Sequence, residues 1–430
     1  MADVLRTIRQ IGDVDRILAD AKAGPATSGR PKVNTHVHLP PNFSAFETVR
    51  QAVSLAAQQG VRVLGAGNYY DYRPYAEFSK AAEQNDVFPL FGTEIIALQR
   101  DLMDRGIRVN DPGNPGKTYV CGKGITRFET LSPRAGQLLE TLRGSDSRRM
   151  ARVAERMAEV FGGHGIATGL DAEKVVDRVA ARHGCDRDTV VLQERHVAQA
   201  FQERLFDLVP QDGRMAALRA VFGAEPKVKA TDAVGIQNEI RTHLMKSGKA
   251  CFVPEQYVSL AEARELIWQL GGIDCYPVVA DMVSPMCEFE APVDGLVARL
   301  KEMGFTCAEF ITVRNSAKTL AEYVTRLRSA GLAVTAGTEH NTLDRIPMEP
   351  RCVDGSRPSE AALDVFWEGT CVIAAHQHLR QQGQPGFVDR DGRPNPDFPD
   401  AHARIRWFAE LGAERIRAEL FRTTNPAATR

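Results

Sequence analysis

The order of strand-like and helix-like segments constrains this chain most. A β-prone run at 32–38 precedes helical periodicity over 43–60, and an apolar run at 61–68 precedes a second helical segment at 74–86. A further apolar run follows at 87–95. Strands that alternate with helices are typical of a parallel sheet, because each helix carries the chain back across the sheet. The first part of the chain therefore predicts stacked βα units.

The alternation stops in the middle of the 430-residue chain and then resumes. Between about 132 and 243 nearly every segment reads as a helix, which predicts a helical insertion. After residue 260, three segments repeat the order helix, glycine, strand, and the total reaches about seven strands. The best fit is an open or closed (β/α) barrel split by the insertion. A doubly wound sheet is the alternative, and it is less favoured because no glycine-rich phosphate loop follows the first strand.

The predicted domain organisation has four parts. They are an N-terminal helix and linker (1–30), the first part of the barrel (31–131), the helical insertion (132–245), and the second part of the barrel with C-terminal helices (246–430). The first segment is predicted as an amphipathic helix because its apolar residues recur at helical spacing. It lacks the apolar core of a signal peptide.

The composition of the chain argues against some classes of binding partner. The formal net charge of −1 argues against a general electrostatic binder of nucleic acid or membrane. No apolar run approaches the roughly 20 residues that a membrane span needs. The eight cysteines are scattered without a C-x-x-C pair, which predicts buried free thiols in a reducing compartment. We therefore expect a cytoplasmic protein that acts on a small molecule.

Polar residues collect at the ends of the predicted strands, where βα barrels place their active sites. The first strand ends in His36 and His38, whose side chains share one face because side chains alternate along a strand. Two imidazoles on one face favour a metal site. Residues of ligand or hydrogen-bonding type also end the other strands: Asn68, Tyr69, Tyr70, Glu94, Tyr276, Arg314, Glu339, His340, Asn341, His376 and His378. The last two follow an apolar run at 369–375, which reads as a strand or, from Ala374 onward, as a helix.

The order of these motifs resembles the PHP (polymerase and histidinol phosphatase) superfamily of metal-dependent phosphoesterases. The resemblance covers about 31–125 and 255–345 and follows the motifs THVHLPPN, LFGTEI, ARELIWQLGGIDCYP, EMGFTCAEFITVRN and AGLAVTAGTEHN. It implies a (β/α)7-type PHP-like barrel with a helical insertion between its halves and divalent metal ions bridged by hydroxide. The chain departs from the family where Asn68 and Tyr69 replace Asp-His and where Tyr276 replaces a histidine. One or two ions are therefore expected in preference to three.

The resemblance and the strand ends together assign provisional roles. The expected ions are Zn, Mn or Fe, and the expected ligands are His36, His38, Glu94, Glu339 and His376. His340 is the expected general acid or base, because an ordinary imidazole titrates near working pH. Arg314 would clamp a phosphate or carboxylate, and Tyr276 would donate to an oxyanion. The expected substrate-binding residues are Asn68, Tyr69, Tyr70 and Asn341.

The predicted function is a metal-dependent hydrolase, of phosphoesterase type, that uses a metal-activated water at the strand ends. Two alternatives remain open. One is an amidohydrolase-like or sugar-isomerase activity on the same barrel. The other is a ligand-binding or scaffold protein that has lost catalysis and uses the helical insertion as a partner surface.

Overall fold

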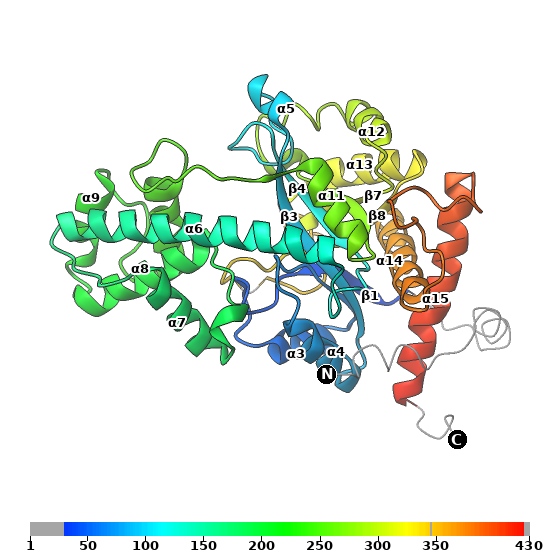
Figure 1. Cartoon of the computed structure of the whole chain (residues 1–430), viewed down its shortest axis with the longest axis horizontal. Helices are drawn as coiled ribbons and strands as arrows, with labels where there is room; N and C mark the ends of the chain where they lie inside the picture. The colour runs from blue at the N-terminus through cyan, green and yellow to red at the C-terminus, as the bar shows by residue number, and fades with distance from the viewer. Residues whose placement is uncertain (1–29, 345, 425–430) are drawn as a thin grey trace.

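The computed structural model describes residues 30–344 and 346–424 (Figure 1). The predicted N-terminal helix and linker therefore lie outside the described residues, apart from Arg30. The centre is an eight-stranded sheet with the order β1-β2-β3-β4-β6-β7-β8, and the short β5 pairs with β3. The strands are β1 (Lys32–Val37), β2 (Val61–Ala66), β3 (Phe88–Leu98), β4 (Lys117–Lys123), β5 (Val258–Ser259), β6 (Ile273–Val278), β7 (Cys307–Ile311) and β8 (Ala333–Gly337).

The first and last strands of this sheet meet, so that it closes almost completely. A parallel bridge joins Val37 to Glu339. The amide of His38 donates to the carbonyl of Glu339 at 2.8 Å, and the amides of Thr338 and Glu339 donate to the carbonyl of His36 at 3.1 and 2.8 Å. The expected distorted (β/α)7-type barrel with helical additions is confirmed, and the doubly wound alternative is wrong because its edges would stay apart.

One strand of the barrel runs against the others. β4 is antiparallel to both β3 and β6, whereas the remaining neighbours in the seven-strand path are parallel. The sequence reading did not predict β4, because its residues include the β-poor Lys117, Gly122 and Lys123. The missed strand matters because it contributes Cys121 to the interior of the barrel.

Helices cover the outside of the barrel (Figure 1). They begin at residues that satisfy the free amides of a first helical turn. The hydroxyl of Thr48 accepts from the amide of Gln51, and Ser259 and Glu262 form a reciprocal capping box. These helices are α3 (Val49–Gln58), α4 (Pro74–Gln84), α5 (Arg100–Asp104), α11 (Leu260–Gln269), α12 (Val293–Glu302), α13 (Ala317–Ser329), α14 (Glu360–Gln381) and α15 (Ala401–Thr424).

The strand reading of 369–375 is wrong, because these residues lie inside the helix α14. α14 packs against α15 and β8, and its residues from Gly369 to Leu379 are all buried. A helix that is apolar on all sides has no periodicity to distinguish it from a buried strand. Despite this apolarity, no helix in the described part of the chain is long and apolar enough to cross a membrane.

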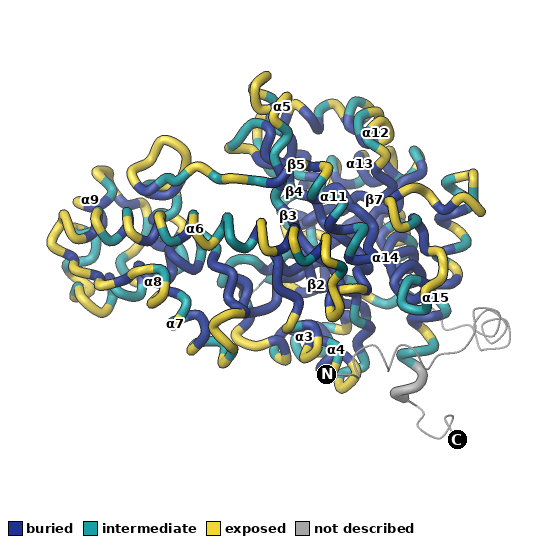
Figure 2. Tube along the Cα trace, in the orientation of Figure 1, coloured by how far each residue is buried: buried dark blue, intermediate teal, exposed yellow. Residues whose placement is uncertain are grey.

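The region between β4 and β5 is helical and has its own core (Figure 2). Its helices are α6 (Pro133–Gly163), α7 (Ala172–His183), α8 (Glu194–Leu208), α9 (Arg214–Phe222) and α10 (Ala233–Ile240), followed by a π-helical turn at Arg241–Met245. The long helix α6 belongs to both regions of the molecule. Its first half buries Leu138 and Leu142 in the barrel core, and its second half buries Met157 and Phe161 in the insertion core.

Candidate functional site

A cavity of about 550 Å³ lies where the carboxyl ends of the barrel strands face the insertion. This is where a barrel of this kind places its ligand site. The barrel contributes His36, Tyr69, Glu94, Cys121, Arg314, Glu339 and Asn341 to the lining. The insertion contributes Asp146, Arg149, Glu194, Arg195, Arg241 and Met245. The cavity is therefore shared, with the histidine–carboxylate cluster on the barrel side.

Three predicted ligands converge at the barrel side of this cavity. The Nε2 atoms of His36 and His38 lie 3.3 and 3.2 Å from Oε2 of Glu94. All three side chains are buried, and these three atoms have no hydrogen-bond partner among the residues that the structure describes. Two donors that each bind one ion at about 2.1 Å in tetrahedral geometry are roughly 3.4 Å apart. The spacing and the unpaired donors therefore fit a divalent metal ion.

A buried carboxylate fixes the orientation of the first histidine. Oε1 of Glu309 lies 3.0 Å from Nδ1 of His36, so that Nδ1–H donates to it and Nε2 is turned toward Glu94. Burial lowers the pKa of His36, but the Glu309 carboxylate outweighs burial and raises it to about 9. Nζ of Lys123 donates to the other oxygen of Glu309 at 2.5 Å and to the carbonyl of Thr35 at 3.2 Å. Sequence reasoning missed both Glu309 and Lys123 as members of the site.

Two glycines leave the space that His36 occupies. A Cβ on Gly67 would lie 2.5 Å from Nε2 of His36, and a Cβ on Gly337 would lie 2.3 Å from Cβ of the same residue. Real Cβ atoms do not approach other heavy atoms this closely. The backbone just after β2 and at the end of β8 can therefore pass beside the imidazole only where the residue is glycine.

Tyr69 connects the second histidine to the carboxylate. Its ring stacks on His38 with centroids 5.2 Å apart and an interplanar angle of 10°. Its hydroxyl donates to Oε1 of Glu94, which leaves Oε2 to face the two histidines. Burial, followed by the Glu94 charge, raises the pKa of Tyr69 well above its ordinary value, so the phenol keeps its proton. For Glu94 itself, the adjacent imidazoles of His36 and His38 outweigh the effect of burial and lower the pKa.

Arg314 and Glu339 form an ion pair at the mouth of the cavity. Asn341 also donates to Oε2 of Glu339 at 2.6 Å. The backbone here is strained, because Glu339 and His340 both have positive φ, at 58° and 49°. Glu339, a predicted metal ligand, is thus engaged by Arg314 and Asn341 and does not join the cluster of His36 and Glu94.

The insertion presents a row of charged side chains to the same cavity. Most are paired: Arg149 lies 2.7 Å from Glu194 and 3.1 Å from Glu255, which in turn lies 3.0 Å from Lys117. Arg195 differs, because among the described residues its closest polar partner is the amide oxygen of Asn238 at 3.4 Å. Burial lowers the pKa of Arg195 to about 10, and the charges of Arg241 and Arg314 add to this shift.

The structure does not bring every predicted site residue to the cavity. The ring of His340 donates from Nε2 to the carbonyl of Ile346 at 3.1 Å and accepts at Nδ1 from the hydroxyl of Thr338 at 2.6 Å. His376, on α14, is similarly engaged by the carbonyl of Gly271 and the amide of Phe387. Neither histidine has a ring nitrogen left for an ion or a proton transfer. Burial lowers the pKa of His340 to about 4.

Three further predicted residues support the backbone away from the cavity. The amide side chain of Asn68 bonds to both the amide and the carbonyl of Leu39. The hydroxyl of Tyr276 donates to Glu290 at 3.0 Å, and the hydroxyl of Tyr70 accepts from the amide of Ile96 at 3.4 Å. These contacts hold the strand ends in place, and the roles predicted for Asn68, Tyr70 and Tyr276 stay predictions.

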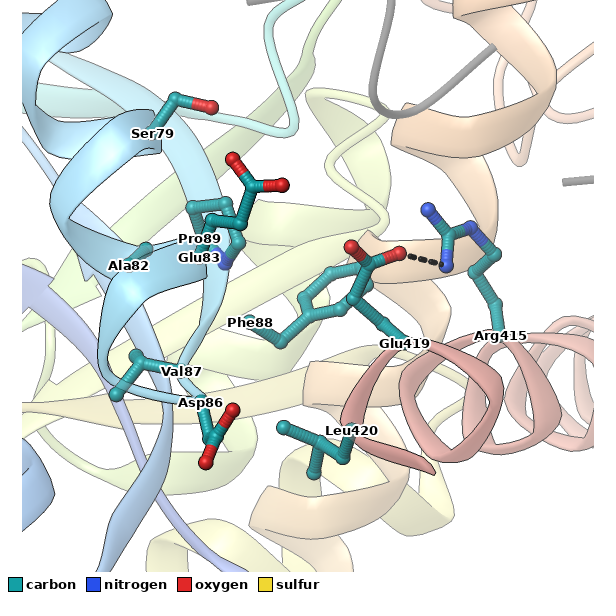
Figure 3. Close-up of a pocket in the computed structure, with 10 residues that line it drawn as sticks. All are labelled: Ser79, Ala82, Glu83, Asp86, Val87, Phe88, Pro89, Arg415, Glu419 and Leu420. Carbon is teal, nitrogen blue, oxygen red and sulfur yellow. Dashed lines mark hydrogen bonds and ion pairs between the residues drawn. The ribbon is translucent and has the colours of Figure 1, made fainter. Parts of the chain in front are cut away.

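A second pocket, where α15 meets α4 and the start of β3, is a poorer candidate site (Figure 3). It offers about 20 Å³, which is room for a single water molecule. Its charged side chains include the ion pair of Arg415 and Glu419, 2.8 Å apart and both on α15. This pocket therefore cannot take a substrate.

Fold and site together define an α/β barrel with a buried histidine–carboxylate cluster at the carboxyl ends of its strands. No protein-family model matches the sequence, and no curated protein matches it either. Among solved structures, it is similar to a protein from Bifidobacterium adolescentis assigned as a metal-dependent phosphoesterase, with 14% identity and a TM-score of 0.52 over 78% of this chain and 96% of that chain. An amidohydrolase from Chromobacterium violaceum, with bound sulfate and no metal, has 16% identity and a TM-score of 0.48, and the match covers 77% of this chain and 99% of that chain.

At these identities the likeness shows the fold alone. The chain shares the barrel fold of the Bifidobacterium adolescentis protein, and membership of the PHP superfamily stays a prediction.

Proposed function

We propose that this protein is a metal-dependent hydrolase of phosphoesterase type. The observation that carries the proposal is the approach of His36 Nε2 and His38 Nε2 to Glu94 Oε2, three buried atoms without a hydrogen-bond partner among the described residues. Buried polar atoms without partners are costly, and a divalent ion between them would satisfy all three. The fold shared with a protein assigned as a metal-dependent phosphoesterase supports the same conclusion.

His36, His38 and Glu94 would hold the ion, with one or two ions expected in all. The ion would supply a Lewis acid and lower the pKa of a bound water toward neutrality. Glu309 keeps His36 in the tautomer that presents Nε2 to the cluster. Tyr69 orients Glu94 through its hydroxyl and His38 through its ring. The protein groups are thus set in place before substrate binds.

The arginines favour an anionic substrate. Arg195 has no carboxylate within ion-pair distance among the described residues, and it lines the same cavity as Glu94. Arg314, which Glu339 holds in place, lines the cavity from the barrel. Guanidinium groups bind phosphate and carboxylate through two parallel hydrogen bonds. We expect Arg195 to bind an anionic group of the substrate, and Arg314 to bind it at the cost of its contact with Glu339.

The metal content of the purified protein tests the proposal. Wild-type protein that has never met a chelator should carry about one equivalent of a transition metal or more, because the site supplies three protein ligands. His36→Ala combined with His38→Ala should lose it. His164→Ala is the matched control, since His164 is exposed at the end of α6. Wild-type protein with less than about a tenth of an equivalent would rule out a metal-dependent activity and favour the ligand-binding or scaffold alternative.

A substrate screen separates the two enzyme classes. Phosphate esters should turn over, and Arg195→Ala should raise KM by about tenfold or more with a smaller change in kcat, because Arg195 is expected to contact a part of the substrate that does not react. Turnover of amides or uronates, with phosphate esters ignored, would instead favour the amidohydrolase-like or sugar-isomerase alternative.

The proposal includes a small-molecule substrate and a cytoplasmic setting. All eight cysteines are free in the described part of the chain, and most of them are buried. Free thiols are usual in a reducing compartment. Fractionation of cells that produce the protein would test the location.

A further inference from the structure

We propose that Cys121 is a ligand of the metal centre, which would therefore prefer Zn²⁺ or Co²⁺ to Mg²⁺ or Mn²⁺. The inference rests on the proposed function, because it assumes that an ion binds between His36 and Glu94. It goes beyond that function by adding a sulfur ligand and a metal class. The residue lies on β4, the strand that sequence reasoning missed.

The position of Cys121 carries the inference. One donor atom from each of His36, Glu94 and Cys121 lies within 4.8 Å of the other two, and all three residues are buried. In the described part of the chain this is the one group of three such residues that meets this criterion, and His38, whose Nε2 lies 3.2 Å from Oε2 of Glu94, is not part of it. Cys121 also lines the cavity directly. Its backbone pairs with that of Glu94 across β3 and β4, which sets the separation of the two side chains.

A second observation points to a ligand at the same place. Nε2 of His36 and Oε2 of Glu94 are buried and have no hydrogen-bond partner among the described residues. The neighbouring thiols do not share this position. Cys275 pairs with Cys121 and with Cys307 along the sheet, and all three thiols belong to one buried cluster, but only Cys121 lines the cavity.

Formal charges also balance with a thiolate at this position. The carboxylates of Glu94 and Glu309 and a thiolate of Cys121 carry three negative charges. Lys123 and a divalent ion carry three positive charges. A buried centre is stable only when its charges are matched in this way. Without the thiolate, the loaded centre would carry one uncompensated positive charge.

Binding through sulfur is an exchange of a proton for a metal ion. The S–H bond of Cys121 breaks, a bond forms between sulfur and the ion, and the proton leaves to the solution. Nothing is oxidised or reduced. Thiolate is a soft ligand that suits Zn²⁺ and Co²⁺, whereas Mg²⁺ and Mn²⁺ prefer oxygen ligands.

Cobalt provides a direct readout of the ligand, independent of catalysis. We would titrate Co²⁺ into the metal-free full chain and record the near-ultraviolet spectrum, where sulfur-to-cobalt charge transfer absorbs strongly. Wild type should show this band. Cys121→Ser should bind Co²⁺ without it and should lose about tenfold or more of the preference for Zn²⁺ over Mn²⁺. Cys275→Ser, a buried thiol one strand away, should keep the band.

X-ray absorption of the zinc-loaded wild type supports the test if Cys121→Ser does not fold. A sulfur ligand scatters at about 2.3 Å from zinc, beyond nitrogen and oxygen ligands at about 2.0–2.2 Å. If Co²⁺ and Zn²⁺ bind without a charge-transfer band or a sulfur shell, the inference about Cys121 is wrong and the proposed function stands. If wild type binds neither ion, both fail.

Discussion

The barrel and the insertion of this protein bury different kinds of side chain. The barrel encloses ionisable side chains, with His36, His38, Glu94, Lys123 and Glu309 all buried. The insertion core consists of apolar residues from α6 to α10 and the segment that follows. Buried charges stabilise a fold only when they are paired, and apolar groups need no such partner. The barrel interior therefore depends on matched charges, whereas the insertion core depends on apolar packing.

The two regions meet at the cavity, where the insertion presents its charged residues. Arg149 and Glu194 contact each other there, and Glu255 connects them to Lys117 of β4. The insertion is therefore apolar within and charged toward the barrel. Four predictions follow from this division.

The largest effect is expected in the insertion core. Phe201 on α8 is fully buried and packs against Phe161 with centroids 5.3 Å apart. Phe201→Ala should cost about 3–5 kcal/mol of unfolding free energy, through lost burial and the cavity left behind. Urea denaturation would measure it. Metal content per folded molecule should stay at the wild-type value, and a variant that lost its metal while folded would show that the insertion core supports the metal site.

The second prediction compares one substitution in both regions. Gly67→Ala places a methyl group 2.5 Å from Nε2 of His36, so it should cost about 1–3 kcal/mol and displace the imidazole from the metal site. Gly162→Ala on α6 meets no atom within 4 Å and should stabilise the protein by about 0.5–1 kcal/mol, because alanine favours the helix. Thermal denaturation and metal affinity of the two variants give the comparison. Equal effects would contradict the close packing of Gly67 on His36.

The third prediction concerns a carboxylate that should not touch the ion. Glu309→Gln keeps the shape of the side chain but removes the charge that orients His36, so metal affinity should fall by about 10–100-fold. Competition with a chelating dye would measure the affinity. The control is Glu290→Gln, since Glu290 is equally buried but accepts from the amides of Val279 and Ala280 instead. If Glu290→Gln lost as much metal affinity, the loss in Glu309→Gln would not be specific to its contact with His36.

The smallest effect, taken per pH unit, is expected in the acid sensitivity of the fold. Burial lowers the pKa of His376 in the barrel and of His196 in the insertion to about 3. Above pH 6.5 both are neutral in the folded and unfolded chain and contribute nothing to pH dependence. Below it, the unfolded chain takes up protons that the folded chain refuses, so stability falls by about 1.4 kcal/mol per pH unit for each residue.

His376→Gln and His196→Gln should each reduce this slope by about 1.4 kcal/mol per pH unit between pH 6 and pH 4. Urea denaturation of metal-free protein at several pH values would measure the slopes. Unchanged slopes would show that the two histidines can take up protons inside the fold.

The sequence predicted the barrel because the alternation of strand-like and helix-like segments depends only on residues that are close together in the chain. The pairing of His36 with His38 follows from the end of β1, whereas β3 continues past Glu94 to Leu98, so Glu94 lies inside its strand and not at the end that the sequence predicted. Two segments escaped prediction for opposite reasons. β4 contains glycine and lysine, which are uncommon in strands. The second half of α14 is buried on all sides, so it lacks the periodic pattern of a surface helix.

The partners behind the site could not be predicted for a different reason. Glu309 reaches His36 from a strand 273 residues away in the chain, and Lys123 reaches Glu309 from 186 residues away. Arg195 comes to the cavity from the insertion. Contacts of this kind depend on how the whole barrel closes. The one local signal was the Glu309 carboxylate within the apolar strand β7, since a buried charge requires a partner.

The helix α6 has a consequence for the size of the substrate. Its 31 residues span about 46 Å at the rise of an α-helix, and its two halves are anchored in different cores. A helix with both ends embedded acts as a rigid spacer between the regions that carry Glu94 and Arg195. The distance between Glu94 and Arg195 is then fixed. Under the proposed function, a substrate that contacts both residues would be selected by its length.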